Sequence, residues 1–405
     1  MLQFAAMRAA LRKLLRVVAI TASVAVGLAL AGFAYGWAAR GLLLTTDDVE
    51  YARPEDHPVV LPRDHAAHPD FKTEWWYWTG HLAADDGREY GFELVFFRLR
   101  TPGVWHDHLP VWWFLKSHAT VAQFAIVDKR TGEHVVADRR AENSRSDVGA
   151  ATDRLHVWTY DWSASAAPPG RDEDGVRLVA AMDRYAIDLR LTPEKPAVLH
   201  GDRGLMRRDP GGITSNYVSF TRLAVAGRLR VDGSERWVTG QAWHDHEYAS
   251  GTLPPGTAGW DWFSIQLDKG AGATPLDGTE LMVYLLRGTD GAALDGSKGT
   301  LVAADGTHAT LLLGRDFRVT TGTEGVWRSP DSGAPYPLGW RIDLPARGWT
   351  LDVSPVARAQ EVLGPAIGVN YWEGAARVRA RTPDGEIGGV AYVELCGYDK
   401  RVDKF

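Results

Sequence analysis

The sequence predicts an all-β protein, and three patterns support this fold class. Apolar residues recur at every second position from residue 74 onward, as in 90–96, which is the period of a strand. Turn signals such as Asp85-Asp86-Gly87 and Asp232-Gly233 separate these runs at short intervals. No long stretch after residue 45 has the period of a helix. We therefore expect a chain built from β-hairpins.

An internal repeat indicates two related domains. Residues 74–82 (EWWYWTGHL) align without gaps on residues 259–267 (GWDWFSIQL), so that Trp75 stands opposite Trp260. Similarity at a distance of one domain length is typical of tandem duplication, with a chance match between two aromatic strands as the alternative. We expect an N-terminal domain at 55–228 and a C-terminal domain at 229–405, joined near residues 226–235. Two domains of this size predict tandem lipocalin-like β-barrels, and two β-sandwiches fit the periodicity nearly as well.

Residues 1–45 predict a cytoplasmic basic segment and a transmembrane anchor. Basic residues between Arg8 and Arg16 precede the uncharged, apolar stretch Val17–Ala39, which is long enough to cross a bilayer with the N-terminus in the cytoplasm. A cleaved signal peptide is the alternative, with Ala34-Tyr35-Gly36 as the cleavage site. In both cases the residues that follow are expected outside the cytoplasmic membrane, in the periplasm, either anchored or secreted.

Composition excludes some classes of function. The net charge of -6 is spread along the chain without a basic block, which argues against nucleic acid as a partner. The single cysteine, Cys396, rules out an intramolecular disulfide. No nucleotide-binding fingerprint is present, so we expect no cofactor. The 17 Trp residues predict wide aromatic surfaces.

The first candidate site is the run from Glu74 to Trp78. In a strand, Glu74, Trp76 and Trp78 lie on one face, and Trp75 and Tyr77 lie on the other. A carboxyl packed among indoles is poorly solvated, so its pKa rises and it becomes a proton donor at neutral pH. An ion pair with a nearby Arg63 or Lys72 is the alternative.

The second candidate site is residues 241–248 (QAWHDHEY). Trp243, Asp245 and Glu247 share one strand face, while His244 and His246 share the other face. Two histidines separated by one residue can begin a metal site, but no third ligand is identifiable unless His106-Asp107-His108 approaches. We prefer hydrogen-bonded polar residues at a barrel mouth and expect no metal.

The third candidate site is residues 259–263, where Asp261 lies between two tryptophans and shares its face with Phe263. An unpaired carboxylate in such surroundings would be costly, so Asp261 is the first choice for an acid. The C-terminal strands add the aromatic residues Tyr371 and Trp372. Nearby Glu373 and Glu394 are expected to be cross-strand partners of basic residues.

Four segments carry a family resemblance. Residues 62–80 (PRDHAAHPDFKTEWWYWTG), 240–247 (GQAWHDHE), 259–263 (GWDWF) and 392–398 (YVELCGY) resemble the AttH-like branch of the carotenoid 1,2-hydratase (hydroxyneurosporene synthase) superfamily. The resemblance implies two lipocalin-like domains. The named hydratases add water to an isoprenoid double bond without a cofactor. AttH-like members are often labelled secreted hydrolases, and some lie beside ABC-type export systems.

The resemblance implies acid-catalysed water addition to an isoprenoid, carotenoid-like or other lipid substrate. Protonating an alkene creates a carbocation, which needs a desolvated acid and nearby aromatic rings. Asp261 or Glu74 is the expected acid, and His244 or His246 the group that positions water. A lipid carrier beside an ABC transporter, with no catalysis, is the alternative. The expected substrate-binding residues are Trp75, Trp76, Tyr77, Trp78, Trp243, Trp260, Trp262, Tyr371 and Trp372.

Overall fold

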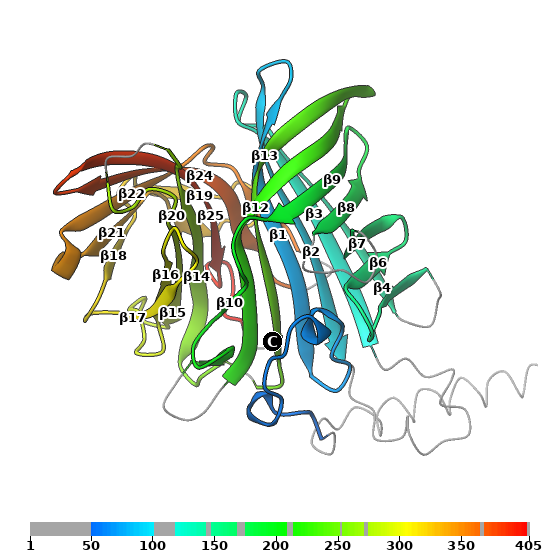
Figure 1. Cartoon of the computed structure of the whole chain (residues 1–405), viewed down its shortest axis with the longest axis horizontal. Helices are drawn as coiled ribbons and strands as arrows, with labels where there is room; N and C mark the ends of the chain where they lie inside the picture. The colour runs from blue at the N-terminus through cyan, green and yellow to red at the C-terminus, as the bar shows by residue number, and fades with distance from the viewer. Residues whose placement is uncertain are drawn as a thin grey trace, which may run out of the picture. The chain divides into compact units, whose positions relative to one another are not determined.

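Strands form almost all of the regular structure in the computed structural model (Figure 1). The structure describes residues 50–100, 118–142, 147–167, 175–208, 214–251, 253–270, 274–364 and 368–402. Within these ranges the helices are short 3₁₀ turns: η2 (Pro54–Asp56), η3 (Arg63–His65) and η6 (Pro345–Arg347). None of the described helices has the length and apolar character needed to cross a membrane. The all-β prediction is confirmed, while the expected anchor and His106 to His108 lie outside the described residues.

The first sheet has 13 strands in the order β4-β3-β2-β1-β13-β12-β9-β8-β7-β6-β5, with β10 and β11 paired to β12. Its two ends approach each other, because β6 contacts β3 and β4 and the Arg139 guanidinium lies 4.3 Å from the ring of Trp162. The sheet is therefore a nearly closed barrel. Its strands are β1 (Thr73–Ala84), β2 (Glu89–Arg100), β3 (His118–Asp128), β4 (His134–Glu142), β5 (Val148–Ala150), β6 (His156–Thr159), β7 (Trp162–Ala166), β8 (Val176–Ala181), β9 (Tyr185–Pro193), β10 (Val198–Leu199), β11 (Leu205–Arg207), β12 (Thr214–Val231) and β13 (Ser234–Ala249).

The second sheet has 10 strands in the order β17-β16-β15-β14-β25-β24-β22-β21-β18, with β23 paired to β24. It curves into a half-barrel (Figure 1), and a separate hairpin of β19 (Val326–Arg328) and β20 (Pro335–Pro337) contributes to its core. Its strands are β14 (Thr257–Leu267), β15 (Glu280–Gly288), β16 (Lys298–Val302), β17 (His308–Leu312), β18 (Arg318–Thr321), β21 (Trp340–Leu344), β22 (Trp349–Pro355), β23 (Glu361–Val362), β24 (Tyr371–Thr382) and β25 (Gly385–Cys396).

The two sheets repeat one strand order, which is consistent with two lipocalin-like domains. Four meandering strands, β1 to β4 or β14 to β17, are followed in space by a final hairpin that pairs with the first strand, β13-β12 or β25-β24. The strands aligned in sequence, β1 and β14, therefore occupy equivalent places. Residues 226–235, expected to join the domains, lie in the β12–β13 hairpin, and the chain passes between sheets at 250–256. The domain limits themselves stay a prediction.

Strand alternation divides the buried side chains into three main cores. Each sheet encloses its own core, with Trp76 and Phe96 in the first and Phe263 and Trp372 in the second. A third cluster lies between the sheets and includes Trp243, together with Tyr77 and Tyr217 from the first and Trp262, Tyr284 and Tyr392 from the second. The two sheets therefore pack through their outer faces.

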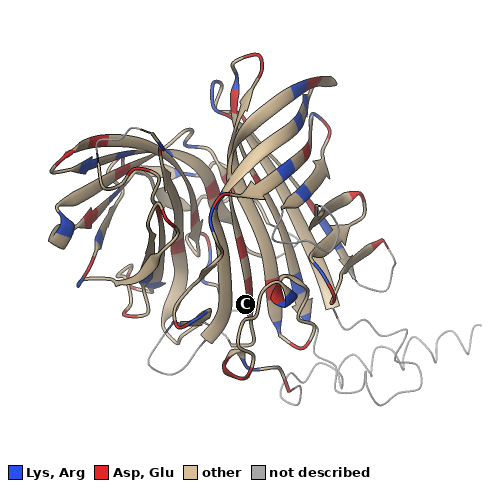
Figure 2. Cartoon of the chain, in the orientation of Figure 1, with Lys and Arg blue, Asp and Glu red and all other residues tan. Residues whose placement is uncertain are grey.

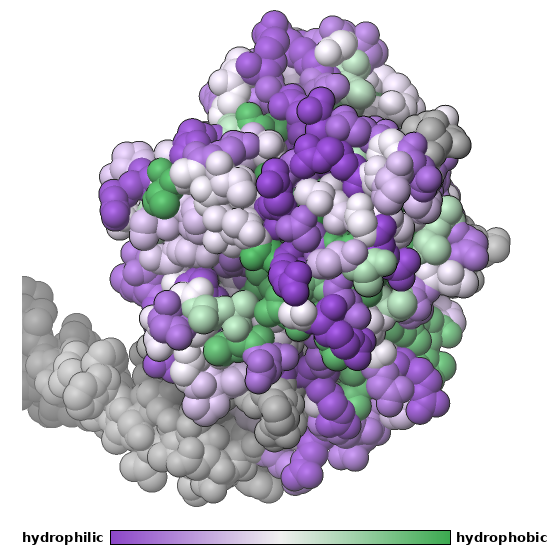
Figure 3. Space-filling model, turned by 90° about the vertical axis from the view of Figure 1, so that its left-hand side faces the viewer, coloured by the Kyte–Doolittle hydropathy of each residue, from purple (hydrophilic) through white to green (hydrophobic). Residues whose placement is uncertain are grey.

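The surface is mixed in character. Acidic and basic residues are interspersed along the strands (Figure 2), in agreement with the absence of a basic block in the sequence. Seen from the side of the second sheet, most of the face is hydrophilic, with hydrophobic residues gathered in its central and lower parts (Figure 3). Such apolar exposure is normal for a globular protein.

Candidate functional site

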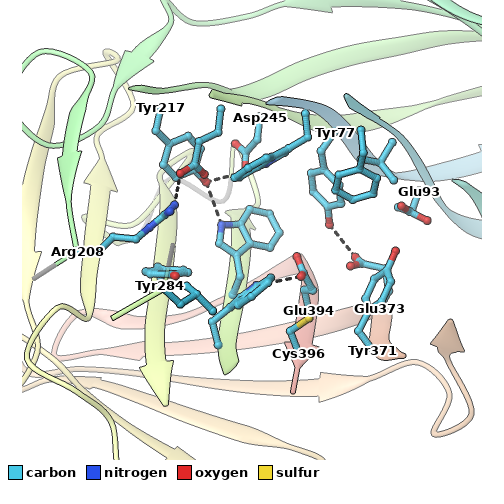
Figure 4. Close-up of a pocket in the computed structure, with 17 residues that line it drawn as sticks. Tyr77, Glu93, Arg208, Tyr217, Asp245, Tyr284, Tyr371, Glu373, Glu394 and Cys396 are labelled. Carbon is cyan, nitrogen blue, oxygen red and sulfur yellow. Dashed lines mark hydrogen bonds and ion pairs between the residues drawn. The ribbon is translucent and has the colours of Figure 1, made fainter. Parts of the chain in front are cut away.

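A cavity lies between the two sheets. About 110 Å³ inside it is open to water-sized molecules, and about 870 Å³ is free of protein atoms when the solvent at its opening is included. Its walls come from β1, β2, β12 and β13 on one side and from β14, β15, β24 and β25 on the other (Figure 4). The lining residues are Trp75, Tyr77, Glu93, Val95, Phe97, Arg208, Tyr217, Asp245, Glu247, Leu253, Trp260, Trp262, Tyr284, Tyr371, Glu373, Glu394 and Cys396.

The repeat explains the aromatic walls. Trp75 and Tyr77 alternate with core residues of the first barrel, so they point outward from β1 into the cavity. Their aligned counterparts, Trp260 and Trp262, point into the same cavity from β14. Tyr77 and Trp262 meet edge to face at 5.4 Å. The two strands aligned in sequence thus contribute aromatic side chains to the same site.

Three glutamates form an acidic cluster at one side of the cavity. Glu373 lies directly opposite Glu394 across the β24–β25 pair, and Glu93 approaches from β2. Glu373 accepts a hydrogen bond of 2.7 Å from the hydroxyl of Tyr77, as Figure 4 shows. Among the described residues, neither carboxyl oxygen of Glu93 has a hydrogen-bond partner, and nor does Oε2 of Glu373.

This acidic cluster is expected to hold protons at neutral pH. Burial, reinforced by the neighbouring Glu394, raises the pKa of Glu93 and of Glu373 well above the ordinary value. Burial also raises the pKa of Glu394 to about 7, although its carboxylate accepts a hydrogen bond of 2.9 Å from Nε1 of Trp260. Acids that cannot all ionise together are suited to donating a proton.

Asp245 lies on the other side of the cavity and is surrounded by donors. Nε1 of Trp243 donates to Oδ1 at 2.6 Å, Tyr217 donates to Oδ2 at 2.6 Å, and Ser219 donates to Oδ1. Because Nε1 of Trp262 donates to the Tyr217 oxygen at 3.0 Å, the Tyr217 proton is directed toward Asp245. Burial raises the pKa of Asp245 to about 7, against the effect of these three hydrogen bonds. Asp245 is therefore placed to accept a proton near neutral pH.

A buried histidine lies behind Asp245. His200 Nε2 lies 2.7 Å from the Ser219 hydroxyl, and its Nδ1 lies 2.9 Å from the Thr300 hydroxyl of the second sheet. When Ser219 donates to Asp245, its oxygen is free to accept the Nε2 proton of His200. Thr300 then donates to Nδ1, so this chain of hydrogen bonds fixes the orientation of the serine hydroxyl.

Arg208 is the one cationic side chain among the described residues that line the cavity. It pairs with Glu247, and its guanidinium lies 5.0 Å from the centre of the Tyr284 ring. Burial alone would lower the pKa of Arg208, but Glu247 raises it, so the guanidinium stays charged. One side of the cavity thus contains Asp245 and the ion pair of Arg208 with Glu247. The other side contains the glutamate cluster (Figure 4).

The structure brings five of the expected substrate-binding residues together: Trp75, Tyr77, Trp260, Trp262 and Tyr371 line the cavity. Trp243 lies behind this wall and holds Asp245. Trp76 and Trp78 lie in the core of the first barrel, and Trp372 lies in the core of the second. The reason is strand alternation, which turns neighbouring residues to opposite faces.

Glu74 does not match the expected protonated acid. Its carboxylate accepts hydrogen bonds from Arg98 at 2.8 Å, His68 at 2.8 Å and His246 at 2.9 Å. Burial alone would raise the pKa of Glu74, but the charge of Arg98 and these hydrogen bonds hold it below the ordinary value. The ion-pair alternative is therefore correct in kind, with Arg98 rather than Arg63 or Lys72 as the partner.

The expected histidines belong to the first barrel rather than to the cavity. His246 stacks on Trp76 at 4.9 Å, while His244 stacks on Trp78 at 4.3 Å. His246 lies with His68 and Glu74 in a group whose potential metal-ligand atoms are within 4.8 Å of one another. The guanidinium of Arg98 already balances the charge of Glu74 there.

Asp261 also points away from the cavity, into the second half-barrel. Both of its carboxyl oxygens accept hydrogen bonds from the Tyr398 hydroxyl at 3.1 Å, and Arg287 Nε lies 3.5 Å away. Burial raises the pKa of Asp261 to about 6, against the nearby charge of Arg287. The catalytic roles assigned to Asp261, Glu74 and the two histidines stay predictions, but none of these residues lines the cavity.

Several cavity residues had no assigned role in the sequence analysis, although their strands carry a signal. Glu93 precedes Val95 and Phe97 at two-residue spacing, and Glu373 follows Tyr371 in the same way. A carboxyl on an outward strand face that is otherwise apolar or aromatic marks a second buried surface. Arg208, Tyr217 and Tyr284 offer no such signal. Glu373 and Glu394, expected beside basic residues, instead face each other.

Fold and site together define a class of proteins: two lipocalin-like sheets that enclose an acidic, aromatic cavity between their outer faces. The AttH-like family model matches residues 52–398. The chain therefore belongs to the AttH-like family, as the sequence motifs predicted.

Solved structures agree with this assignment. An AttH structure from Nitrosomonas europaea is 28% identical with a TM-score of 0.72, and the match covers 86% of this chain and 99% of that chain. Kievitone hydratase from Nectria haematococca is 14% identical with a TM-score of 0.63, and the match covers 88% of this chain and 99% of that chain. At this level of identity the match shows a shared fold alone. No curated protein sequence matches the chain at a significant level.

Proposed function

We propose that the protein is a hydratase-like enzyme that adds water to a carbon–carbon double bond of a hydrophobic substrate held between the two sheets. One observation carries the proposal: a cavity with aromatic walls places a proton-holding glutamate cluster opposite a carboxylate surrounded by donors. Water addition needs both kinds of group, because one proton must reach carbon while another leaves water. The hydratase named among the similar structures points in the same direction.

The reaction is proposed to begin at the glutamate cluster. Glu373 or Glu93 gives its proton to one alkene carbon, and the other carbon becomes a cation. The rings of Trp75, Trp262 and Tyr77 lie around this space and stabilise positive charge through their faces. A water oxygen then bonds to the cation while Asp245 accepts a proton from that water. The product gains one hydrogen and one hydroxyl, and exchange with solvent then returns a proton to the glutamate and removes one from Asp245.

Substrate identity and location extend the proposal beyond the site. An isoprenoid or another lipid fits an aromatic cavity and the alkene chemistry described above. We place the protein at the outer face of the cytoplasmic membrane, held by Val17–Ala39 or secreted after cleavage, and beside an ABC-type exporter. The support for this location and partner is the sequence of residues 1–45 and the family resemblance.

A mass measurement separates an enzyme from a carrier. Membrane lipid extract is incubated with wild type, Glu373→Gln, or the control Glu386→Gln, which changes an exposed carboxyl on β25. We expect a product heavier by one water with wild type and the control, and a loss of at least about 100-fold in Glu373→Gln. Lipid that binds to all three proteins but never changes mass would identify a carrier.

A further inference from the structure

The side chain of Arg208 carries a donor that no described residue satisfies. Its terminal nitrogen donates to Glu247, which neutralises the charge of the guanidinium. Its Nε is buried and has no hydrogen-bond partner within the described part of the chain. The same side chain lines the cavity, where Figure 4 shows it reaching in beside Tyr217 and Tyr284. A ligand bound against this wall can supply the acceptor that Nε lacks.

An unsatisfied, buried donor in a binding site discriminates between ligands. A ligand without an acceptor leaves Nε of Arg208 buried and unpaired, whereas an acceptor oxygen satisfies this donor. The penalty for leaving such a donor unpaired corresponds to a factor on the order of 10 to 100 in affinity. Sites built to hydrogen-bond a ligand reject analogues that lack the matching group. A pure hydrocarbon is therefore a poor match for this cavity.

The charges around Arg208 also restrict the charge that the acceptor group of a ligand can carry. Glu247 already balances the guanidinium, and Asp245 lines the same side of the cavity. An anionic ligand would add a further negative charge beside these two carboxyls, in a site where burial weakens screening. A cationic ligand would have to approach the guanidinium itself. A neutral oxygen, such as a carbonyl, accepts the Nε proton without either repulsion.

The remaining walls of the cavity indicate the chemical character of the rest of the ligand. Trp75, Phe97, Leu253, Trp260 and Trp262 offer apolar surface around the cavity. We propose that the cavity recognises a neutral amphiphile, with an apolar body against these side chains and one uncharged acceptor oxygen on Nε of Arg208. This inference rests on the proposed function, because it names the substrate class of the same site, and it narrows that class to oxygen-bearing lipids.

A binding series with saturated probes tests the inference. Decane, 2-decanone, decanoate and decylammonium share one chain length and contain no carbon–carbon double bond, so tryptophan fluorescence reports binding without the proposed reaction. We expect wild type to bind 2-decanone at least about tenfold more tightly than each of the other three. The preference over decane should fall below about threefold in Arg208→Lys, which keeps a charge beside Glu247 but lacks Nε–H in place.

Two further proteins serve as controls for folding and position. The double variant Arg208→Met with Glu247→Gln removes both charges together, and it should lose the same preference with a preserved unfolding transition. Arg177→Lys changes an exposed ion pair with Asp188 and should bind every probe as wild type does. Equal affinity of wild type for decane and 2-decanone would overturn the inference, as would tightest binding of an ionic probe or no binding at all.

The binding series and the test for water addition can fail separately. If wild type shows no preference for 2-decanone but still adds water to its substrate, recognition by Arg208 is refuted and the proposed function stands. A clear preference for 2-decanone, with lipid never changed in mass, would support the neutral amphiphile as a carried ligand and refute the hydratase.

Discussion

Two buried glutamates show how neighbours determine protonation at the residue scale. Glu74 and Glu373 are both fully buried in strands. Arg98 lies against Glu74 and holds its pKa below the ordinary value, whereas burial and the facing Glu394 raise the pKa of Glu373. Both residues follow the same physical rules, but only Glu373 is left with a proton to give. Its neighbours, rather than its own strand, create this difference.

Replacing Glu394 by glutamine should change how stability depends on pH. Burial raises the pKa of Glu394 to about 7 in the folded protein, against about 4.3 when unfolded. Between these values the folded state binds more protons, so the contribution of Glu394 to stability is present at low pH and is lost as pH rises through about 7. Relative to wild type, Glu394→Gln should gain on the order of 3 kcal/mol in the free energy of unfolding from pH 4 to pH 8.

Denaturant unfolding at a series of pH values measures this difference. Glu386→Gln, an exposed carboxyl on the same strand, is the matched control and should show a smaller change. A difference between wild type and Glu394→Gln that stays constant with pH would contradict the buried, proton-holding glutamate.

Removing the Ser219 hydroxyl should shift the pH dependence of activity. The rate should rise as Asp245 loses its proton near pH 7 and fall when the proton donors Glu373 and Glu93 ionise at higher pH. Ser219 donates to Asp245 and favours its charged form, so Ser219→Ala should move the rising limb upward by about one pH unit. A limb that stays in place or moves to lower pH would argue against Asp245 as the base. Ser163→Ala, on β7 of the first barrel, is the control.

At the scale of strands, close backbone approach depends on glycine. Gly240 lies on β13, where this strand pairs with β1. A Cβ at this position would stand 1.9 Å from the carbonyl oxygen of His81. The β1–β13 pair carries both Tyr77 and Asp245, so a shift in this pair would move both of these cavity residues. Glycine is the residue that allows the two strands to lie this close.

Gly240→Ala should therefore destabilise the fold by about 1–3 kcal/mol, because two paired strands must move apart. The neighbouring residue Thr239 is exposed and provides the control. The free energy of unfolding of Thr239→Ala should stay within about 0.5 kcal/mol of the wild-type value. Urea unfolding followed by tryptophan fluorescence measures both variants. Equal stability of Gly240→Ala and wild type would show that β1 and β13 can move apart without loss of stability, which would contradict the requirement for glycine here.

Sequence patterns predict the strands and their faces but not the position of the site. Period-two alternation correctly separates Trp75 and Tyr77 from Trp76, and Asp245 from His246. Alternation cannot show which face is enclosed by a barrel and which one meets the other sheet. That choice depends on sheet curvature, which arises from contacts between distant strands. Sequence patterns therefore favour Asp261 as the acid, although its side chain faces away from the cavity.

At the scale of the whole molecule, a buried ion network joins the sheets. Glu280 on β15 accepts hydrogen bonds from Arg222 on β12 at 2.5 Å and from Lys195 at 2.7 Å. All three side chains are buried, and Lys195 also donates to the carbonyl oxygen of Gly278 at 2.7 Å. Because the network spans both sheets, it fixes the two walls of the cavity relative to each other.

Glu280→Ala should lower the free energy of unfolding by about 3–5 kcal/mol, since it leaves two buried cations without their partner. The exposed pair of Glu235 with Arg228 is the matched control, and Glu235→Ala should change stability by less than about 0.5 kcal/mol. Calorimetry of both variants makes the comparison. Similar melting behaviour of the two variants would show that the sheets are held together by other contacts.

The central claim is that chemistry occurs between the sheets rather than inside either barrel. Its most direct test is the rate at which ¹⁸O from labelled water enters the lipid product with wild type, Asp245→Asn and Asp261→Asn. We predict a loss of at least about 100-fold in Asp245→Asn and a change below about threefold in Asp261→Asn. Incorporation that survives in Asp245→Asn and disappears in Asp261→Asn would contradict the claim and place the reaction within the second half-barrel.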